Sequence, residues 1–154
     1  MKLLIDLQNP CGAKDIPYRT EIKQWLDCAV QQCGFQGNQA EVTIRIVDET
    51  EMFQLNSQYR GKSKPTNVLS FPFEQVAPIK SDFLGDIVIC HSVVKSEAEQ
   101  QNKQVQQHWA HLTIHGFLHL IGYDHISDIQ AEEMESLEIL VMQALSYQNP
   151  YLIK

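Results

Sequence analysis

The sequence predicts an α+β fold, a single domain in which helices pack on a mixed sheet of about four strands. Short apolar segments typical of strands are interspersed with longer segments of helical periodicity. Two central strands follow each other without a helix between them, which favours a mixed sheet over a doubly wound one. The 154 residues, 44% hydrophobic and 20% charged, have the size and composition of one globular domain. We therefore expect residues 1–154 to form a single domain.

The first half of the chain alternates expected strands with expected helices. Lys2 to Leu7 has the pattern of a first strand. Val42 to Ile46 alternates apolar and polar residues, which is the period of a half-buried strand. A short helix should begin at Asp48, because Glu51 stands three residues later, and should end at Gly61. The helix expected between the two strands depends on apolar residues at helical spacing: Ile22, Trp25, Leu26, Ala29, Val30 and Cys33.

The middle of the chain predicts two consecutive strands. Val68 to Phe73 contains Pro72, which cannot donate to a ladder, so we expect a strand that lies at an edge or leaves the sheet there. An edge strand can offer its backbone to a ligand. Phe83 to Cys90 is nearly continuous apolar sequence, which is typical of an interior strand. Asp86 within that strand needs a partner, so it is expected to be a structural acceptor or a group that orients a ligand.

The last third of the chain is expected to be helical from about Val93, as one helix or two before the final one. Ser127 and Gln130 form a capping box for the last helix. The buried side of that helix is expected to consist of Met134, Leu137, Ile139, Leu140, Met142 and Leu145. Much of the formal net charge of -7 comes from glutamates on the same helix: Glu132, Glu133, Glu135 and Glu138.

The segment HGFLHLIGYDH, from His115 to His125, carries the strongest chemical signal. His115 and His119 are four residues apart, so on a helix they share one face at a separation of about 6 Å. Gly122 can adopt the left-handed conformation that ends a helix, which lets His125 reach the same point. Three imidazoles that leave a fourth position open suit a catalytic zinc. We favour this interpretation over three histidines with no shared function. We expect one Zn²⁺ ion, with nickel or copper as substitutes in purified samples.

The histidine spacing coincides with the metzincin protease signature H-E-x-x-H-x-x-G-x-x-H, with one difference. Gly116 stands where those proteases carry the glutamate that acts as general base. We therefore expect the metal geometry with a different substrate and proton chemistry. A metallopeptidase, or another zinc hydrolase of a small substrate, stays as an alternative, and a carboxylate within about 3 Å of the attacking water would favour it.

Composition argues against several classes of protein. No apolar run approaches the roughly 20 residues of a membrane span, so we expect no membrane association. The four cysteines form no C-x-x-C pair and the N-terminus does not resemble a secretory signal, which fits reduced thiols in a cytoplasm. The acidic net charge argues against indiscriminate nucleic-acid binding. Arg60, Lys62 and Lys64 nevertheless form a basic cluster, which is either a solvated loop or a local binding site.

Three segments together resemble the bacterial YbeY family of rRNA maturation endoribonucleases, over nearly the whole chain. They are the histidine segment, T-N-V-L-S-F-P from Thr66 to Pro72, and G-D-I from Gly85 to Ile87. The resemblance implies a zincin-like fold, a zinc held by His115, His119 and His125, and cleavage of single-stranded RNA rather than DNA. It also implies processing of the 3′ end of the 16S rRNA precursor and ribosome quality control in the cytoplasm, with the small ribosomal subunit and ribosomal proteins as partners.

The residues expected to carry the reaction are Arg60, His115 and Asp124. Arg60 matches the family's functional arginine and could hold a phosphate opposite the metal; capping its own helix is the alternative. Asp124, beside the third ligand, and His111, one turn before His115, are candidate proton-transfer or orienting groups. Water and the RNA's own 2′-hydroxyl both stay open as the nucleophile. Asn67 departs from the family, which usually has aspartate there.

A noncatalytic alternative also stays open. In a ribosome-associated zinc protein, the metal would only staple the histidine turn to the fold. Removing the metal should then unfold the protein, whereas loss of activity with the fold retained would favour catalysis.

Overall fold

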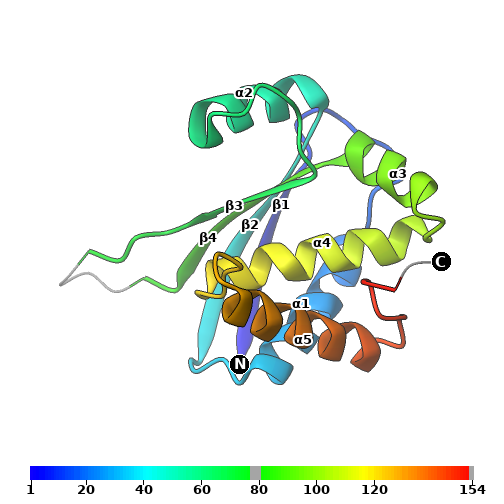
Figure 1. Cartoon of the computed structure of the whole chain (residues 1–154). Coiled ribbons are helices and arrows are strands. Elements are labelled where there is room, and N and C mark those ends of the chain that lie inside the picture. The colour runs from blue at the N-terminus through cyan, green and yellow to red at the C-terminus, as the bar shows by residue number, and fades with distance from the viewer. Residues whose placement is uncertain (77–80, 153–154) are drawn as a thin grey trace.

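The computed structural model describes residues 1–76 and 81–152 (Figure 1). The helices and strands follow one another in the predicted order, and the region after β4 forms two helices before the last one. The elements are β1 (Lys2–Gln8), α1 (Arg19–Cys33), β2 (Gln39–Val47), α2 (Glu49–Arg60), β3 (Val68–Pro72), β4 (Phe83–Cys90), α3 (His91–Gln100), α4 (Val105–Leu120) and α5 (Asp128–Ala144).

The four strands of the described residues form one mixed sheet in the order β1-β2-β4-β3. β1, β2 and β4 run parallel, and β3 pairs antiparallel with β4. β4 is therefore an interior strand and β3 an edge strand, as Pro72 predicted. The predicted α+β class with a mixed four-stranded sheet is confirmed.

Helices cover the two faces of the sheet unequally. α1 and α4 pack on one face and α5 packs against both of them, whereas α2 contacts β4 (Figure 1). The large core lies between the sheet and the first group of helices and includes Leu3, Ile22, Leu26, Ile44, Ile87, Ile114, Phe117, Leu118 and Met134. A smaller cluster lies beneath α2 and consists of Val47, Met52, Leu69, Val88 and Cys90. Burial of α4 against β3 and β4 fixes the helix that carries the histidines.

Local signals set several helix ends where the sequence predicts them. The Asp48 side chain accepts the backbone N–H of Glu51 at 2.9 Å at the start of α2. Gly61 ends α2 with φ at 67°, a conformation that favours glycine. Ser127 and Gln130 form the expected capping box of α5. Among the described residues, no helix has the length and hydropathy that crossing a membrane requires.

The predicted buried face of α5 is wrong at Leu140, whose side chain is 46% exposed. Glu138 lies on the buried face and is completely inaccessible to solvent. Positions four, seven and eight residues after Met134 share one side of a helix, and Leu140 lies off that side. The buried positions of α5 are Met134, Glu138, Val141 and Met142.

Asp86 has a structural partner. It lies on β4 in register with Thr43 of β2, and partial burial raises the pKa of its carboxyl although the Thr43 hydroxyl donates to it. Its neighbour Ile87 faces α4, so Asp86 lies on the opposite face of the sheet from the histidines.

Candidate metal centre and cleft

The histidines come together because α4 ends abruptly and the chain turns back. His115 and His119 lie on one face of α4, four residues apart. Gly122 has φ at 107° and its N–H donates to the carbonyl oxygen of His119 at 3.2 Å. This turn returns the chain toward α4, so that His125 faces the two helical histidines. Gly122 therefore adopts the positive φ that was predicted from the sequence, and this conformation turns the chain after α4.

The three imidazoles have the separation of a metal ligand set. One nitrogen of each ring lies within 4.8 Å of the other two, and Nε2 of His115 is 3.2 Å from Nε2 of His119. Two nitrogen ligands of a tetrahedral zinc, each about 2.0–2.1 Å from the ion, are about 3.3 Å apart. The observed spacing fits that arrangement.

The other ring nitrogens show which atoms are free to bind an ion. Nδ1 of His115 is 3.1 Å from Oε1 of Glu138, and Nδ1 of His119 is 3.0 Å from the carbonyl oxygen of Tyr123. A carboxylate and a carbonyl only accept hydrogen bonds, so in the neutral rings each Nδ1 donates its hydrogen. Two Nε2 lone pairs then face each other with no hydrogen between them. A cation between them relieves this repulsion, so the donor set fits a metal ion.

Glu138 holds the centre of a buried hydrogen-bond network behind His115. Its Oε1 accepts from His115, from Nε2 of His111 at 2.6 Å and from the Tyr151 hydroxyl at 2.9 Å. Burial raises the pKa of the Glu138 carboxyl, but the hydrogen bonds from His111 and His115 outweigh burial and bring the pKa to about 2. Glu138 is therefore a carboxylate in the folded protein at neutral pH.

Neither Glu138 nor Tyr151 was predicted from the sequence as part of this network. Glu138 had a detectable signal, because it is a charged residue on the apolar side of α5 and such a residue needs a partner. Tyr151 lies in the C-terminal segment, which Lys103 holds by a bond from its Nζ to the carbonyl oxygen of Pro150 at 2.5 Å. Nothing in the local sequence indicates that Tyr151 contacts Glu138.

His111 lies behind the ligand set rather than in the cleft. Burial lowers the pKa of its imidazole more than the carboxylate of Glu138 raises it, so the ring is neutral in the folded protein. Its ring lines a second cavity of about 560 Å³, together with Tyr151. The hydrogen-bond link from His111 to His115 therefore runs through Oε1 of Glu138.

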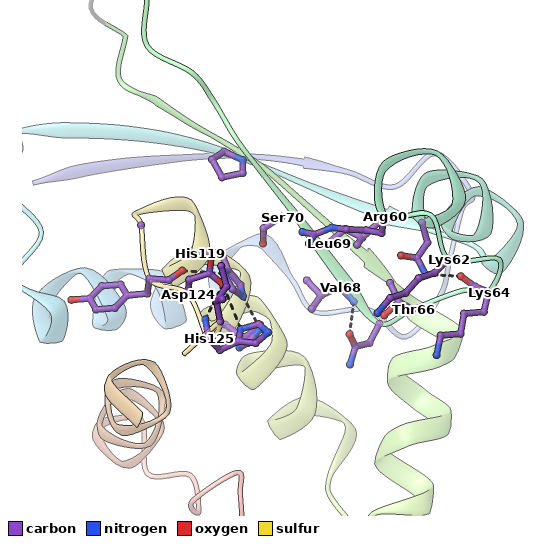
Figure 2. A pocket seen from close by; sticks show the side chains of 17 residues that line it. Arg60, Lys62, Lys64, Thr66, Val68, Leu69, Ser70, His119, Asp124 and His125 are labelled. Atoms are coloured by element: carbon purple, nitrogen blue, oxygen red, sulfur yellow. Dashed lines mark hydrogen bonds and ion pairs between the residues drawn. The ribbon is translucent and has the colours of Figure 1, made fainter. Parts of the chain in front are cut away.

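The face of the three histidines opens into a cleft of about 680 Å³. In Figure 2, His119, Asp124 and His125 lie on one side, Arg60, Lys62 and Lys64 lie on the other, and β3 passes between them. The residues that line the cleft are Asn56, Arg60, Lys62, Lys64, Thr66, Asn67, Val68, Leu69, Ser70, Pro72, His115, His119, Gly122, Tyr123, Asp124, His125 and Ile126. The basic cluster and the histidines thus share one surface.

Arg60 ends α2 at the margin of the cleft. Across residues 1–76 and 81–152, no hydrogen bond or ion pair holds its guanidinium group. The loop after it is held in place, because Asn56 Nδ2 donates to the carbonyl oxygen of Lys64 at 2.8 Å and Ser57 Oγ to that of Lys62 at 3.2 Å. Among the described residues, Arg60 is thus a cation without a partner at the end of α2, next to a fixed loop, and it does not bond the carbonyls of its own helix.

Asp124 lies beside His119 and His125 without a direct hydrogen bond to either ring. Its Oδ1 accepts the backbone N–H of His125 at 2.8 Å and lies 4.0 Å from Nδ1 of both His119 and His125. The carboxylate therefore shapes the turn that carries His125 and lies in the cleft, where it is 44% exposed.

Gly116 packs too closely against the sheet to be replaced by glutamate without a shift. A Cβ atom there would lie 2.8 Å from Cγ2 of Ile87 and 3.2 Å from Oγ of Ser70. The Ser70 hydroxyl also donates to the carbonyl oxygen of Gly116 at 3.0 Å, which binds β3 to α4. The side-chain space in which metzincin proteases place their base is therefore filled by Ile87 of β4 and Ser70 of β3.

Asn67 joins the start of β3 to α3. Its Nδ2 lies 3.0 and 3.4 Å from the two carboxylate oxygens of Glu97, and His108 Nε2 lies 2.9 Å from Glu97 Oε1. Burial raises the pKa of Glu97, but the hydrogen bonds from His108 and Asn67 bring it below its ordinary value. His108 is engaged in this pair and does not line the histidine cleft. The amide at position 67 is thus a donor to a carboxylate, which an aspartate could not be.

Comparison with known proteins gives a solved structure of similar fold and a matching family. The chain is 26% identical to TM1509 from Thermotoga maritima, whose solution structure superposes with a TM-score of 0.57, and the match covers 97% of this chain and 99% of that one. The family model of the endoribonuclease YbeY matches residues 6–146, nearly the whole chain. The chain therefore belongs to the YbeY endoribonuclease family.

Proposed function

We propose that the protein is a metal-dependent endoribonuclease that cleaves single-stranded RNA during maturation of the 3′ end of 16S rRNA. The observation that carries the proposal is the cleft that places three converging imidazoles opposite an arginine that has no partner in the part of the chain the structure describes. The family supports RNA as the substrate. In this proposal residues 1–154 act as one hydrolase domain.

One Zn²⁺ ion is the proposed cofactor, held by His115, His119 and His125. Imidazole nitrogens are common zinc ligands, and the bonds from Nδ1 to Glu138 and to the Tyr123 carbonyl leave Nε2 of two rings available. Nickel and copper also bind three imidazoles and could replace zinc in a purified sample. When bound, such an ion polarises a phosphoryl oxygen and makes water near it more acidic.

Arg60 is proposed to bind the scissile phosphate from the opposite side of the cleft. A guanidinium group can donate two parallel hydrogen bonds to a phosphate and stabilise the charge that develops on its nonbridging oxygens. The free state of the Arg60 side chain supports this role, because no protein carboxylate of the described residues competes for it. Lys62 and Lys64 would attract the neighbouring phosphates.

Asp124 is the proposed proton acceptor of the cleft. Its carboxylate lies within the cleft beside two of the ligands and carries no salt bridge to lysine or arginine among the described residues. It could take a proton from either candidate nucleophile, water or the 2′-hydroxyl of the RNA. His115 contributes to catalysis in this proposal as a ligand oriented by Glu138.

Two observations weigh against the alternatives. The close packing of Gly116 on Ser70 and Ile87 leaves no room for the glutamate base of a metzincin peptidase. The histidine turn is held by its own hydrogen bonds and α4 by the core and the Glu138 network, which favours a fold that persists without the metal. Catalysis therefore accounts for the ligand set better than a purely structural ion does.

Cleavage of a 16S RNA fragment with a 3′ extension tests the proposal. The metal-loaded protein should cleave it, a chelator should abolish cleavage, and a DNA oligonucleotide of the same sequence should stay intact. His119→Ala should lose stoichiometric zinc and activity, whereas His91→Ala, a matched change on α3 outside the cleft, should keep both. Unchanged zinc content of His119→Ala would refute the ligand assignment.

Arg60 needs a variant series of its own. Arg60→Ala should retain zinc and lose RNA turnover, and Arg60→Lys should recover only part of it, because lysine keeps the charge without the two-pronged donor geometry. Normal turnover by Arg60→Ala would remove the arginine from the mechanism. Full zinc occupancy without RNA cleavage by the wild type would leave the noncatalytic alternative as the better account.

The proposed setting is the cytoplasm, with the small ribosomal subunit and ribosomal proteins as partners in rRNA maturation and ribosome quality control. This part is supported by family membership. Cosedimentation of the protein with immature small subunits, but not with mature ones, would test it.

A further inference from the structure

The free edge of β3 forms part of the cleft between Arg60 and the histidines. Within residues 1–76 and 81–152, β3 has β4 on one side and no strand on the other. The cleft is lined by Val68, Leu69 and Ser70 of β3. Figure 2 shows them between the basic loop, which carries Lys62 and Lys64, and the histidine turn, which carries Asp124 and His125. An RNA strand bound between Arg60 and the ligands would therefore pass along this edge.

The strand pairing determines which main-chain groups face the cleft. Cys90 N–H donates to the Asn67 carbonyl and Phe73 N–H to the Leu84 carbonyl, both at 2.9 Å, so odd-numbered residues of β3 exchange hydrogen bonds with β4. In an antiparallel pair the intervening residues direct both N–H and C=O away from the partner strand. The residues of β3 that direct these groups to the free edge are Val68, Ser70 and Pro72.

Within the described residues of β3, one N–H on this edge has no hydrogen-bond partner; it belongs to Ser70, whose residue as a whole is 9% exposed. The N–H of Val68 donates to the Oδ1 atom of Asn67 at 2.6 Å, and Pro72 has no N–H. The N–H and C=O of Ser70 remain, next to each other on the same side of the strand. The Ser70 hydroxyl is bound to the Gly116 carbonyl, which fixes this main-chain segment against α4.

This pattern suits a nucleobase better than a peptide. An added peptide strand needs donors and acceptors at alternate positions along the edge, and this edge offers a single free donor. An adjacent donor and acceptor can instead pair with the Watson–Crick edge of one base. That edge is free in single strands and occupied in duplexes. The basic loop beside the edge also suits a polyanion.

We propose that the main chain of Ser70 pairs with the Watson–Crick edge of an unpaired RNA base next to the scissile phosphate, so that β3 selects single strands. This inference rests on the proposed function, since it assumes RNA in the cleft. It assigns the selection to main-chain groups of an edge strand rather than to a side chain.

Proline at position 70 tests the main-chain donor directly. Ser70→Pro removes the N–H, and an edge strand tolerates proline where the N–H points outward. Ser70→Ala keeps the N–H and also lacks the hydroxyl. The ratio of the RNA affinities of the two variants therefore isolates the effect of the N–H donor. We expect Ser70→Pro to bind a single-stranded oligonucleotide roughly tenfold more weakly than Ser70→Ala, with equal zinc content. Equal RNA affinity of the two folded variants would overturn the inference.

Modified RNA gives a second test that does not depend on folding of the proline variant. Oligonucleotides with N1-methyladenosine or N3-methyluridine beside the cleavage site block the Watson–Crick edge, and 7-deazaadenosine leaves it intact. Wild-type protein should bind the methylated RNAs roughly tenfold more weakly than the unmodified and 7-deaza RNAs. Equal binding of all four would overturn the inference, as would turnover of an extended peptide that Ser70→Pro abolishes.

The outcomes separate this inference from the proposed function. If the wild type cleaves RNA normally, and neither base methylation nor Ser70→Pro changes RNA affinity, the proposed nuclease activity stands and selection by β3 is refuted. Discrimination in binding without any cleavage would support the β3 selection and contradict the nuclease.

Discussion

Oε1 of Glu138 lies 3.1 Å from Nδ1 of His115, so a carboxylate of α5 that is inaccessible to solvent orients a proposed metal ligand of α4. Hydrogen bonds of this kind fix the ring orientation and the tautomer of a ligating histidine. The proposed metal site is therefore expected to depend on a residue that does not itself line the cleft.

Glu138→Gln should weaken zinc binding about 10–100-fold, which is the usual effect of removing an orienting carboxylate. The amide oxygen can still accept from His111, His115 and Tyr151 in place of Oε1, but it carries no negative charge, and the NH₂ group takes the place of Oε2, which has no hydrogen-bond partner among the described residues. Competition with a chromophoric chelator measures the dissociation constant. Glu133→Gln, an exposed change on the same helix, is the control and should bind zinc like the wild type. Equal affinities of the two variants would count against the orienting role.

Tyr151→Phe should destabilise the metal-free protein by about 1.5–3 kcal/mol, because it removes one neutral donor to the charged Glu138 carboxylate. Burial, reinforced by the charge of Glu138, raises the pKa of the Tyr151 hydroxyl, so the group stays protonated and donates across the neutral range. Urea unfolding in the presence of chelator measures the loss. Tyr147→Phe makes the same chemical change outside the network, and a loss as large in that control would contradict the explanation.

The local parts of the site could be predicted from the sequence, and the parts that join distant segments could not. His115, His119, Gly122 and His125 lie within one helix and its turn, where spacing alone determines proximity. Glu138 lies on another helix. Its position on an apolar face indicates that it has a buried partner without indicating which residue that is.

The same limit applies to Arg60 and to Asn67. The sequence placed Arg60 at a helix end, but its position across the cleft from the histidines depends on how α2 packs over β4 and how β3 packs on α4. The bond between Asn67 and Glu97 joins residues 30 positions apart. The strand and helix order needed only periodicity and turn residues, which is why the fold class was predicted correctly.

The contribution of Glu97 to stability should disappear in acid. Its pKa is lower in the folded protein than its ordinary value of 4.5, so this contribution is fully present above about pH 4.5 and is lost as the pH falls through the folded pKa. The difference in unfolding free energy between the wild type and Glu97→Gln should therefore shrink below pH 4.5, measured by urea unfolding with chelator. Glu99→Gln, exposed on the same helix, is the control. A difference that stays constant down to pH 3 would show that the carboxylate charge is not responsible.

Asn67→Asp should destabilise the protein by about 1–3 kcal/mol at pH 7, because it removes the donors to Glu97 and places a second carboxylate beside it. The backbone bond to Val68 N–H can persist, since either side chain offers an oxygen there. The loss of stability should therefore come from repulsion between the two carboxylates and not from loss of the hydrogen bond at the start of β3.

A double-mutant cycle separates these causes. In the Glu97→Gln background the glutamine amide can donate to the introduced carboxylate, so Asn67→Asp should cost less there than in the wild type, by about 1–2 kcal/mol. Urea unfolding of the four proteins at pH 7 gives the coupling energy. Strictly additive effects would mean that Asn67 and Glu97 do not interact energetically. A favourable coupling would show that the amide at position 67 and the carboxylate at position 97 depend on each other, and that aspartate at position 67 requires a different partner on α3.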